Sequence, residues 1–139
     1  MSDNLFHLEI ITPEKVLVSD DIDSIEAPGV DGEFQILAGH TPFLTGLTTG
    51  LMIFSKSGKK TFISISGGFC EIQPQKTIVL AHTAELSHEI DKARAEEAQK
   101  RAQARLESKD KPSSDDIDIE RAQAALYRAV NRLKVAEMK

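Results

Sequence analysis

Residues 87 to 98 read Ser-His-Glu-Ile-Asp-Lys-Ala-Arg-Ala-Glu-Glu-Ala, and the 139-residue chain changes character at this stretch. All eight glycines and all six phenylalanines precede it, whereas alanine and charged residues at three- and four-residue spacing dominate from here onward. Alanine, glutamate, lysine and arginine all favour helix, and glycine does not. The sequence therefore predicts two units, residues 1–86 made of strands and residues 87–139 made of helices.

The first unit divides into short apolar or alternating runs separated by turn residues. Phe6, Leu8 and Ile10 alternate with polar residues, and turns are expected at Pro28–Gly32 and Lys56–Lys59. The other runs are 16–18, 22–27, 34–37, 43–47, 51–55, 61–66, 69–73 and 77–82, with glycines 39, 46, 50, 67 and 68 between them. This pattern predicts an N-terminal antiparallel β-sandwich of about eight to ten short strands.

The second unit is predicted to be an antiparallel two-helix hairpin. Ser87 is a plausible N-cap for a helix that runs to about Ser108. Residues 109–114 form the link, since Pro112 cannot continue a helix. Ser113 with Asp116 resembles a capping box for a second helix that ends near Ala136.

The apolar faces of the two helices are unequal. The second face has large and small residues at alternating spacings of three and four, namely Ile119, Ala122, Leu126, Ala129, Leu133 and Ala136. The first face is mostly alanine: Ile90, Ala95, Ala98, Ala102 and Leu106. Because alanine buries little apolar area, we expect the hairpin to be weakly held and able to open.

Charge and composition exclude several classes of protein. A net charge of −5 argues against nucleic-acid binding, which needs a basic surface. No apolar run is long enough to span a bilayer, and the N-terminus does not resemble a secretory signal. The single cysteine, Cys70, has no intrachain partner and lies in a strand pattern, which favours a buried side chain in a reducing, cytosolic location.

Arginines form the main chemical pattern of the helices. Arg94, Arg101 and Arg105 share one face of the first helix with Asp91, and ion pairs with Asp91 or Glu97 account for the first two of these arginines. On the second helix, a row is made by Arg121, Arg128 and Arg132. Arg128 and Arg132 lack an acid three or four positions away, which predicts an anion from elsewhere. A phosphate, a carboxylate on the facing helix or an acidic protein partner would each serve.

No catalytic or metal-binding set is predicted. A phosphate-binding loop fails at Ile53 and Lys60, and histidines 7, 40, 82 and 88 lack the ligand spacing of a zinc site. Serines and histidines are present without a nucleophile-elbow pattern. These observations weigh against a small hydrolase and leave open an interaction module or a stand-alone ATP-binding sensor.

In the order of its parts, the chain resembles the epsilon subunits of bacterial F-type ATP synthases. Four stretches carry the resemblance: Leu8–Pro13, Gly32–Gly50, Ser66–Ile72 and Arg128–Ala136. The resemblance implies a non-catalytic rotor subunit of the central stalk, peripheral on the cytoplasmic face of the plasma membrane and not inserted in the bilayer. Its sandwich would bind the gamma subunit and the membrane-embedded c-ring, and its hairpin would either fold on the sandwich or extend into the alpha/beta catalytic head and block ATP hydrolysis.

The same resemblance assigns two sets of residues. The c-ring contact would be the segment Asp31, Gly32, Glu33, Phe34, Gln35, Ile36, Leu37, Ala38, Gly39 and His40. Ile90-Asp91-Lys92-Ala93-Arg94-Ala95 matches the motif of members that bind ATP on the folded hairpin. The implied ATP contacts are Glu85, Asp91, Arg94, Ala95, Arg101, Arg128 and Arg132, with ATP a regulatory ligand rather than a catalytic cofactor and with no metal site.

Overall fold

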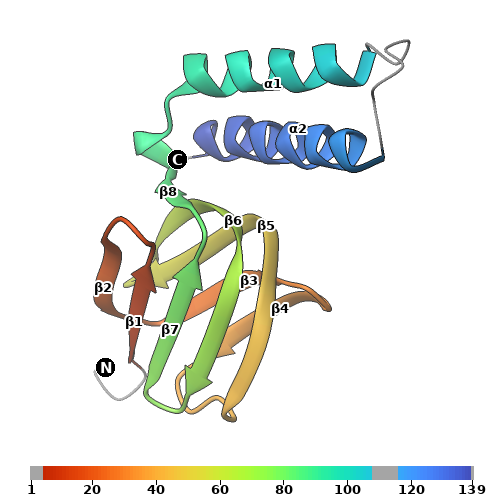
Figure 1. The fold of residues 1–139 in the computed structure, drawn as a ribbon. Coiled ribbons are helices and arrows are strands. Elements are labelled where there is room, and N and C mark those ends of the chain that lie inside the picture. The colour runs from red at the N-terminus through yellow and green to blue at the C-terminus, as the bar shows by residue number, and fades with distance from the viewer. Residues whose placement is uncertain (1–4, 108–115, 139) are drawn as a thin grey trace.

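The structure, a computed structural model, describes residues 5–107 and 116–138, and within them strands are followed by helices (Figure 1). The strands are β1 Phe6–Ile11, β2 Val16–Ile22, β3 Ser24–Gly29, β4 Gly32–Leu37, β5 Phe43–Lys56, β6 Lys59–Gln73, β7 Lys76–Ala81 and β8 Ala84–Leu86. A short 3-10 turn, η2 Ser87–Glu89, leads to helices α1 Lys92–Glu107 and α2 Asp116–Ala136. The predicted sandwich followed by two helices is confirmed.

The strands pair in the order β2-β1-β7-β6-β5-β3-β4, and β8 pairs with β6. The long strands β5 and β6 take part in both layers, so the sheet folds over on itself as a sandwich (Figure 1). One pairing departs from the prediction of an antiparallel sheet. β1 lies parallel to β7, with His7 opposite Lys76 and Ile11 opposite Leu80. A pairing between segments so far apart in the chain leaves no local signal in the sequence.

The predicted breaks at the glycines of β5 and β6 are wrong, because both strands continue through them. Gly50 lies inside β5, where a Cβ atom would come within 2.8 Å of the Pro28 Cβ in β3. Gly68 lies inside β6 at a φ of +136°, and a Cβ atom there would strike the Leu80 carbonyl oxygen of β7. These glycines permit close approach of neighbouring strands rather than a turn.

Large aliphatic side chains fill the space between the two layers. They include Leu8, Ile10, Ile22, Ile25, Ile36, Met52, Ile63, Ile65, Ile72 and Val79, each no more than 1% exposed. Cys70 is buried among them, as its place in a strand pattern predicted. The sandwich thus has a core of its own, which does not depend on the helices.

The first helix begins later than predicted, and its N-cap is not Ser87. The Asp91 carboxylate accepts a hydrogen bond from the backbone N–H of Arg94 at 3.1 Å, and α1 follows at Lys92. An aspartate side chain satisfies a free N–H of the first turn, whereas Ser87 is held in the 3-10 turn. The predicted link at 109–114, with Pro112 and Ser113, lies outside the described residues.

Helix α2 lies between α1 and the sandwich (Figure 1). Four alanines at the helical seam are nearly inaccessible, namely Ala95, Ala102, Ala122 and Ala129. Two larger side chains of the hairpin are also buried, Ile90 at 8% exposed and Val135 at 0%, and the predicted seam omitted Val135. Ile119, which the prediction placed in the seam, is 38% exposed. The expectation of a small-residue contact between the helices is confirmed.

Candidate functional site

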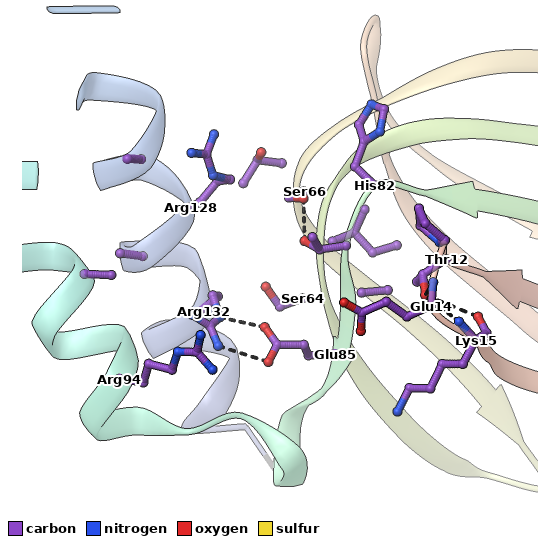
Figure 2. Close-up of a pocket in the computed structure, with 18 residues that line it drawn as sticks. Thr12, Glu14, Lys15, Ser64, Ser66, His82, Glu85, Arg94, Arg128 and Arg132 are labelled. Carbon is purple, nitrogen blue, oxygen red and sulfur yellow. Dashed lines mark hydrogen bonds and ion pairs between the residues drawn. The ribbon is translucent and has the colours of Figure 1, made fainter. Parts of the chain in front are cut away.

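A cleft of about 580 Å³ separates the helical hairpin from the sandwich. Its helical wall carries Arg94 from α1 with Arg128 and Arg132 from α2, alongside alanines 98, 125 and 129. The opposite wall is formed by residues 12–15 between β1 and β2, by Thr49 and residues 64–66 of β5 and β6, and by residues 82–85 at β8. Figure 2 shows the labelled side chains of the two walls on either side of this gap. The volume suits a ligand the size of a nucleotide.

The Arg132 guanidinium crosses the cleft to Glu85 of β8. Its Nε lies 2.6 Å from Glu85 Oε1 and its Nη2 lies 3.0 Å from Oε2, an arrangement that presents two parallel donors to one carboxylate (Figure 2). Both side chains are about two thirds or more buried. The predicted anion for Arg132 is therefore a carboxylate, but it comes from the sandwich and not from the facing helix.

A second polar contact lies next to this ion pair. The Asn131 side-chain amide donates to the Gly50 carbonyl oxygen at 2.9 Å and to the Ser64 hydroxyl at 3.1 Å. Ser64 is only 5% exposed, so the contact satisfies a buried hydroxyl. Asn131 and Arg132 together attach α2 to the sandwich through hydrogen bonds.

Arg94 and Arg128 present guanidinium groups to the cleft without an acidic partner among the described residues. The predicted ion pairs of Arg94 with Asp91 or Glu97, and of Arg101 with Glu97, do not form. In the first case the Asp91 carboxylate is turned to the Arg94 backbone N–H instead. Two cations in one cleft that form no ion pair with a carboxylate favour an anionic ligand.

The structure brings four of the seven predicted ATP contacts together at the cleft: Glu85, Arg94, Arg128 and Arg132. The other three lie elsewhere in this closed arrangement. Asp91 caps α1, Ala95 is fully buried in the helical seam, and Arg101 is exposed on α1 outside the cleft lining.

Apart from Glu85, the part of the cleft that the sandwich supplies was not predicted from the sequence. Glu14 and Lys15 lie on the turn between β1 and β2, and His82 lies between β7 and β8. No helical spacing or motif connects these residues with the arginines, because they come from distant parts of the chain. An isolated basic residue in an acidic unit, Lys15, was the one available signal.

The segment 31–40 lies away from the cleft. Most of it is β4, the strand at the end of the sheet order, and β5 begins beyond it at the end of the sandwich opposite to the helices (Figure 1). Leu37, Phe43 and Leu44 are 54%, 49% and 69% exposed there. The rings of Phe34 and Phe43 meet edge to face with centroids 6.4 Å apart. This end of the sandwich therefore presents apolar surface.

Other chemistry finds little support in the described part of the chain. Within it, no group of three or more His, Cys, Asp or Glu side chains is placed to hold a metal ion. Burial raises the pKa of the Cys70 thiol to about 12, so a thiolate is disfavoured. No helix within residues 5–107 and 116–138 is long and apolar enough to cross a membrane.

The described chain is a β-sandwich joined to a two-helix hairpin, with an arginine-lined cleft between them. Residues 5–87 match the family model for the ATP synthase delta/epsilon chain β-sandwich domain, and residues 88–137 match the model for its long α-helix domain. The chain belongs to the ATP synthase delta/epsilon chain family, among its epsilon chains.

Curated relatives match over nearly the whole chain. The ATP synthase epsilon chain of Desulforamulus reducens is 45% identical over 130 residues, which cover 94% of this chain and 96% of the relative. That of Nitratidesulfovibrio vulgaris strain DP4 is 44% identical and covers 93% of each. Among solved structures, a chain of the Euglena gracilis mitochondrial ATP synthase OSCP/F1/c-ring assembly aligns with a TM-score of 0.78 at 23% identity, covering 95% of this chain and 81% of that one. At this identity the structural match shows the fold alone.

Proposed function

We propose that the chain is a non-catalytic rotor subunit in the central stalk of an F-type ATP synthase, and that its hairpin regulates ATP hydrolysis in response to ATP. The observation that carries the regulatory part is the cleft in which Arg94 and Arg128 face the sandwich without an ion pair to a carboxylate among the described residues. A nucleotide bound there would contact hairpin and sandwich together. It would therefore stabilise the closed hairpin by mass action, because the open form lacks the complete site.

The sandwich, residues 1–86, is proposed to bind the gamma subunit and the c-ring. Supporting this is the exposed apolar surface around Leu37, Phe43 and Leu44, next to the segment 31–40. Several large apolar side chains exposed together on a protein surface favour the binding of a protein partner there. Solved mitochondrial ATP synthase assemblies of Euglena gracilis and Tetrahymena thermophila that contain a chain of this fold also include a c-ring. This role places the subunit peripherally at the cytoplasmic face of the membrane.

The hairpin, residues 87–139, is proposed to open and contact the alpha/beta catalytic head, where it blocks ATP hydrolysis. Two features support opening. The seam between α1 and α2 buries mainly alanines, and the attachment of α2 to the sandwich rests on few polar contacts, centred on Asn131 and Arg132. Opening would free Arg132 from Glu85 and expose a row of guanidinium groups to acidic protein surface.

Calorimetric titration of ATP into the wild-type chain and the Arg94→Ala variant tests the sensor. We expect heat of binding for the wild type and a weaker affinity for the variant. The absence of heat for the wild type at millimolar ATP would rule out the sensor. The alternative function, a stand-alone ATP-binding module, predicts the same titration result. Assembly of the ATP synthase distinguishes the two functions, because only an epsilon subunit is required for a complete central stalk.

Removal of residues 89–139 tests the division of labour in the assembled complex. We expect the truncated subunit to assemble, since the sandwich has its own core, and to relieve inhibition of ATP hydrolysis. Unchanged hydrolysis would contradict an inhibitory hairpin. Failed assembly would show that the hairpin, and not the sandwich alone, supplies the stalk contacts.

A further inference from the structure

The sandwich wall of the cleft supplies a cation of its own. Lys15 lies in the turn between β1 and β2 and lines the cleft across from Arg94, Arg128 and Arg132. Figure 2 shows Lys15 on the sandwich side of the gap and these three arginines on the hairpin side. The cleft therefore has a cation on each wall, and the sandwich wall also carries Glu14 and Glu85.

The backbone that carries Lys15 is held in place by Thr12. The Thr12 hydroxyl oxygen accepts from the backbone N–H groups of Glu14 and Lys15, at 3.3 and 3.2 Å. The Thr12 backbone N–H donates in turn to the Lys15 carbonyl oxygen at 2.9 Å. A threonine that closes a turn in this way fixes the direction in which the following side chain leaves. The Lys15 backbone is thus held beside the cleft.

Lys15 has no acidic partner within the described part of the chain, although Glu14 and Glu85 line the same cleft. Glu85 is engaged by both donors of Arg132. Three cations, Lys15, Arg94 and Arg128, are therefore left without a carboxylate, and they come from both units. A single extended polyanion can neutralise all three, whereas a monoanion between the walls cannot.

We propose that Lys15 binds the polyphosphate of the nucleotide from the sandwich side, so that the phosphate chain bridges the sandwich and the hairpin. The inference rests on the proposed ATP site and adds a residue and an orientation to it. The phosphates lie among Lys15 and the arginines, and the nucleoside takes the remaining cleft. Because the ligand is held from both walls, each added phosphate strengthens the attachment of the hairpin to the sandwich.

Calorimetric titration of the whole chain with ATP, ADP and AMP tests the inference. For Lys15→Ala we expect ATP to bind about tenfold more weakly than to the wild type, the usual effect of losing one charge-assisted contact at an accessible site. The loss should shrink for ADP and vanish for AMP. Lys15→Arg keeps the charge and should bind ATP within about twofold of the wild type.

Lys59→Ala is the matched control, because Lys59 is also an exposed lysine of the sandwich but lies outside the cleft lining. We expect it to leave all three affinities unchanged. Equal affinity of wild type and Lys15→Ala for ATP would overturn the role of Lys15 while the ATP site stands. An equal loss for ATP, ADP and AMP, or the same loss in Lys59→Ala, would also overturn it. Failure of the wild type to bind ATP would remove the proposed sensor and this inference together.

Discussion

The sandwich and the hairpin are both folded, yet they bury different kinds of side chain. Isoleucine, leucine, methionine and valine fill the sandwich, and burying each contributes about 1.5–3 kcal/mol. Apart from Ile90 and Val135, the described part of the hairpin buries only alanines, so its apolar contacts contribute far less, and hydrogen bonds from Asn131 and Arg132 make up part of its attachment. This difference supports the proposal that the hairpin opens while the sandwich stays folded.

The largest expected effect comes from a cavity in the sandwich. Leu8→Ala should lower the free energy of unfolding by about 2–5 kcal/mol, because Leu8 is fully buried. Reaction of Cys70 with a thiol reagent under increasing urea measures this, since the thiol is buried and its pKa is raised to about 12. Val135→Ala, the matched change in the hairpin, should leave Cys70 protected. If Cys70 became equally reactive in both variants, the sandwich would not be stable independently of the hairpin.

The next effect concerns the attachment of the hairpin. Arg132→Ala leaves the Glu85 carboxylate partly buried without its two donors, which should weaken closure by about 1.5–3 kcal/mol. Faster amide hydrogen exchange along α2, with the exchange of β1 and β7 unchanged, is the expected readout. Arg128→Ala removes a guanidinium that has no ion pair in the described structure and should leave exchange without ligand unchanged. If exchange along α2 rose equally in both variants, the ion pair between Arg132 and Glu85 would not be what holds the hairpin on the sandwich.

A smaller effect is expected at the start of α1. Asp91→Ala should destabilise the hairpin by about 1 kcal/mol without any nucleotide, because the cap on the Arg94 N–H is lost. Asp91→Asn retains an acceptor and should restore most of the stability. Thermal loss of helical circular dichroism measures both. If both variants melted like the wild type, Asp91 would not stabilise α1, and its side chain would be free for a ligand.

The smallest effect belongs to the exposed pair of Asp20 and Lys56 on the sandwich. A hydrogen bond from Lys56 at 2.8 Å lowers the pKa of Asp20 from its ordinary value. Its stabilising contribution is present above the ordinary aspartate pKa and disappears as the pH falls through the depressed folded value. Urea midpoints across this acid range should therefore vary slightly less in Asp20→Asn than in the wild type. An unchanged pH dependence would show that the pair contributes nothing to the sandwich.

Local signals in the sequence determined what could be predicted of the fold. The loss of glycine after residue 87 located the change from strands to helices, and alternation located most strands. The glycines led to a wrong prediction of strand ends. Gly50 allows Pro28 to pack against β5, and in the sequence such a glycine cannot be distinguished from one in a turn. The parallel pairing of β1 with β7 had no local signal at all. Ser87 and Asp91 are both good capping residues, and only the three-dimensional path of the chain chooses between them.

The candidate site was predicted mainly on the hairpin side, with Glu85 the one predicted contact from the sandwich. Helical spacing showed that Arg128 and Arg132 lack an acid on their own helix, and it could not show that Glu85 would reach Arg132 from a strand. Lys15 and His82 belong to turns that the fold, and not the sequence, brings beside the helices. Sites built between two units share this property. The residues of each wall can be predicted from the sequence of their own unit, but the contact between the two walls cannot.

The parallel contact of β1 with β7 also orders events during synthesis. Residues 7–11 cannot complete their pairing until residues 76–80 have left the ribosome, so the sandwich closes late in its own translation. The hairpin residues emerge afterwards, so β5 and β6, on which α2 packs, can pair before α2 is complete. The surface on which α2 packs can therefore form before the helices are synthesised. A hairpin that fails to dock leaves behind a folded sandwich rather than an unfolded chain.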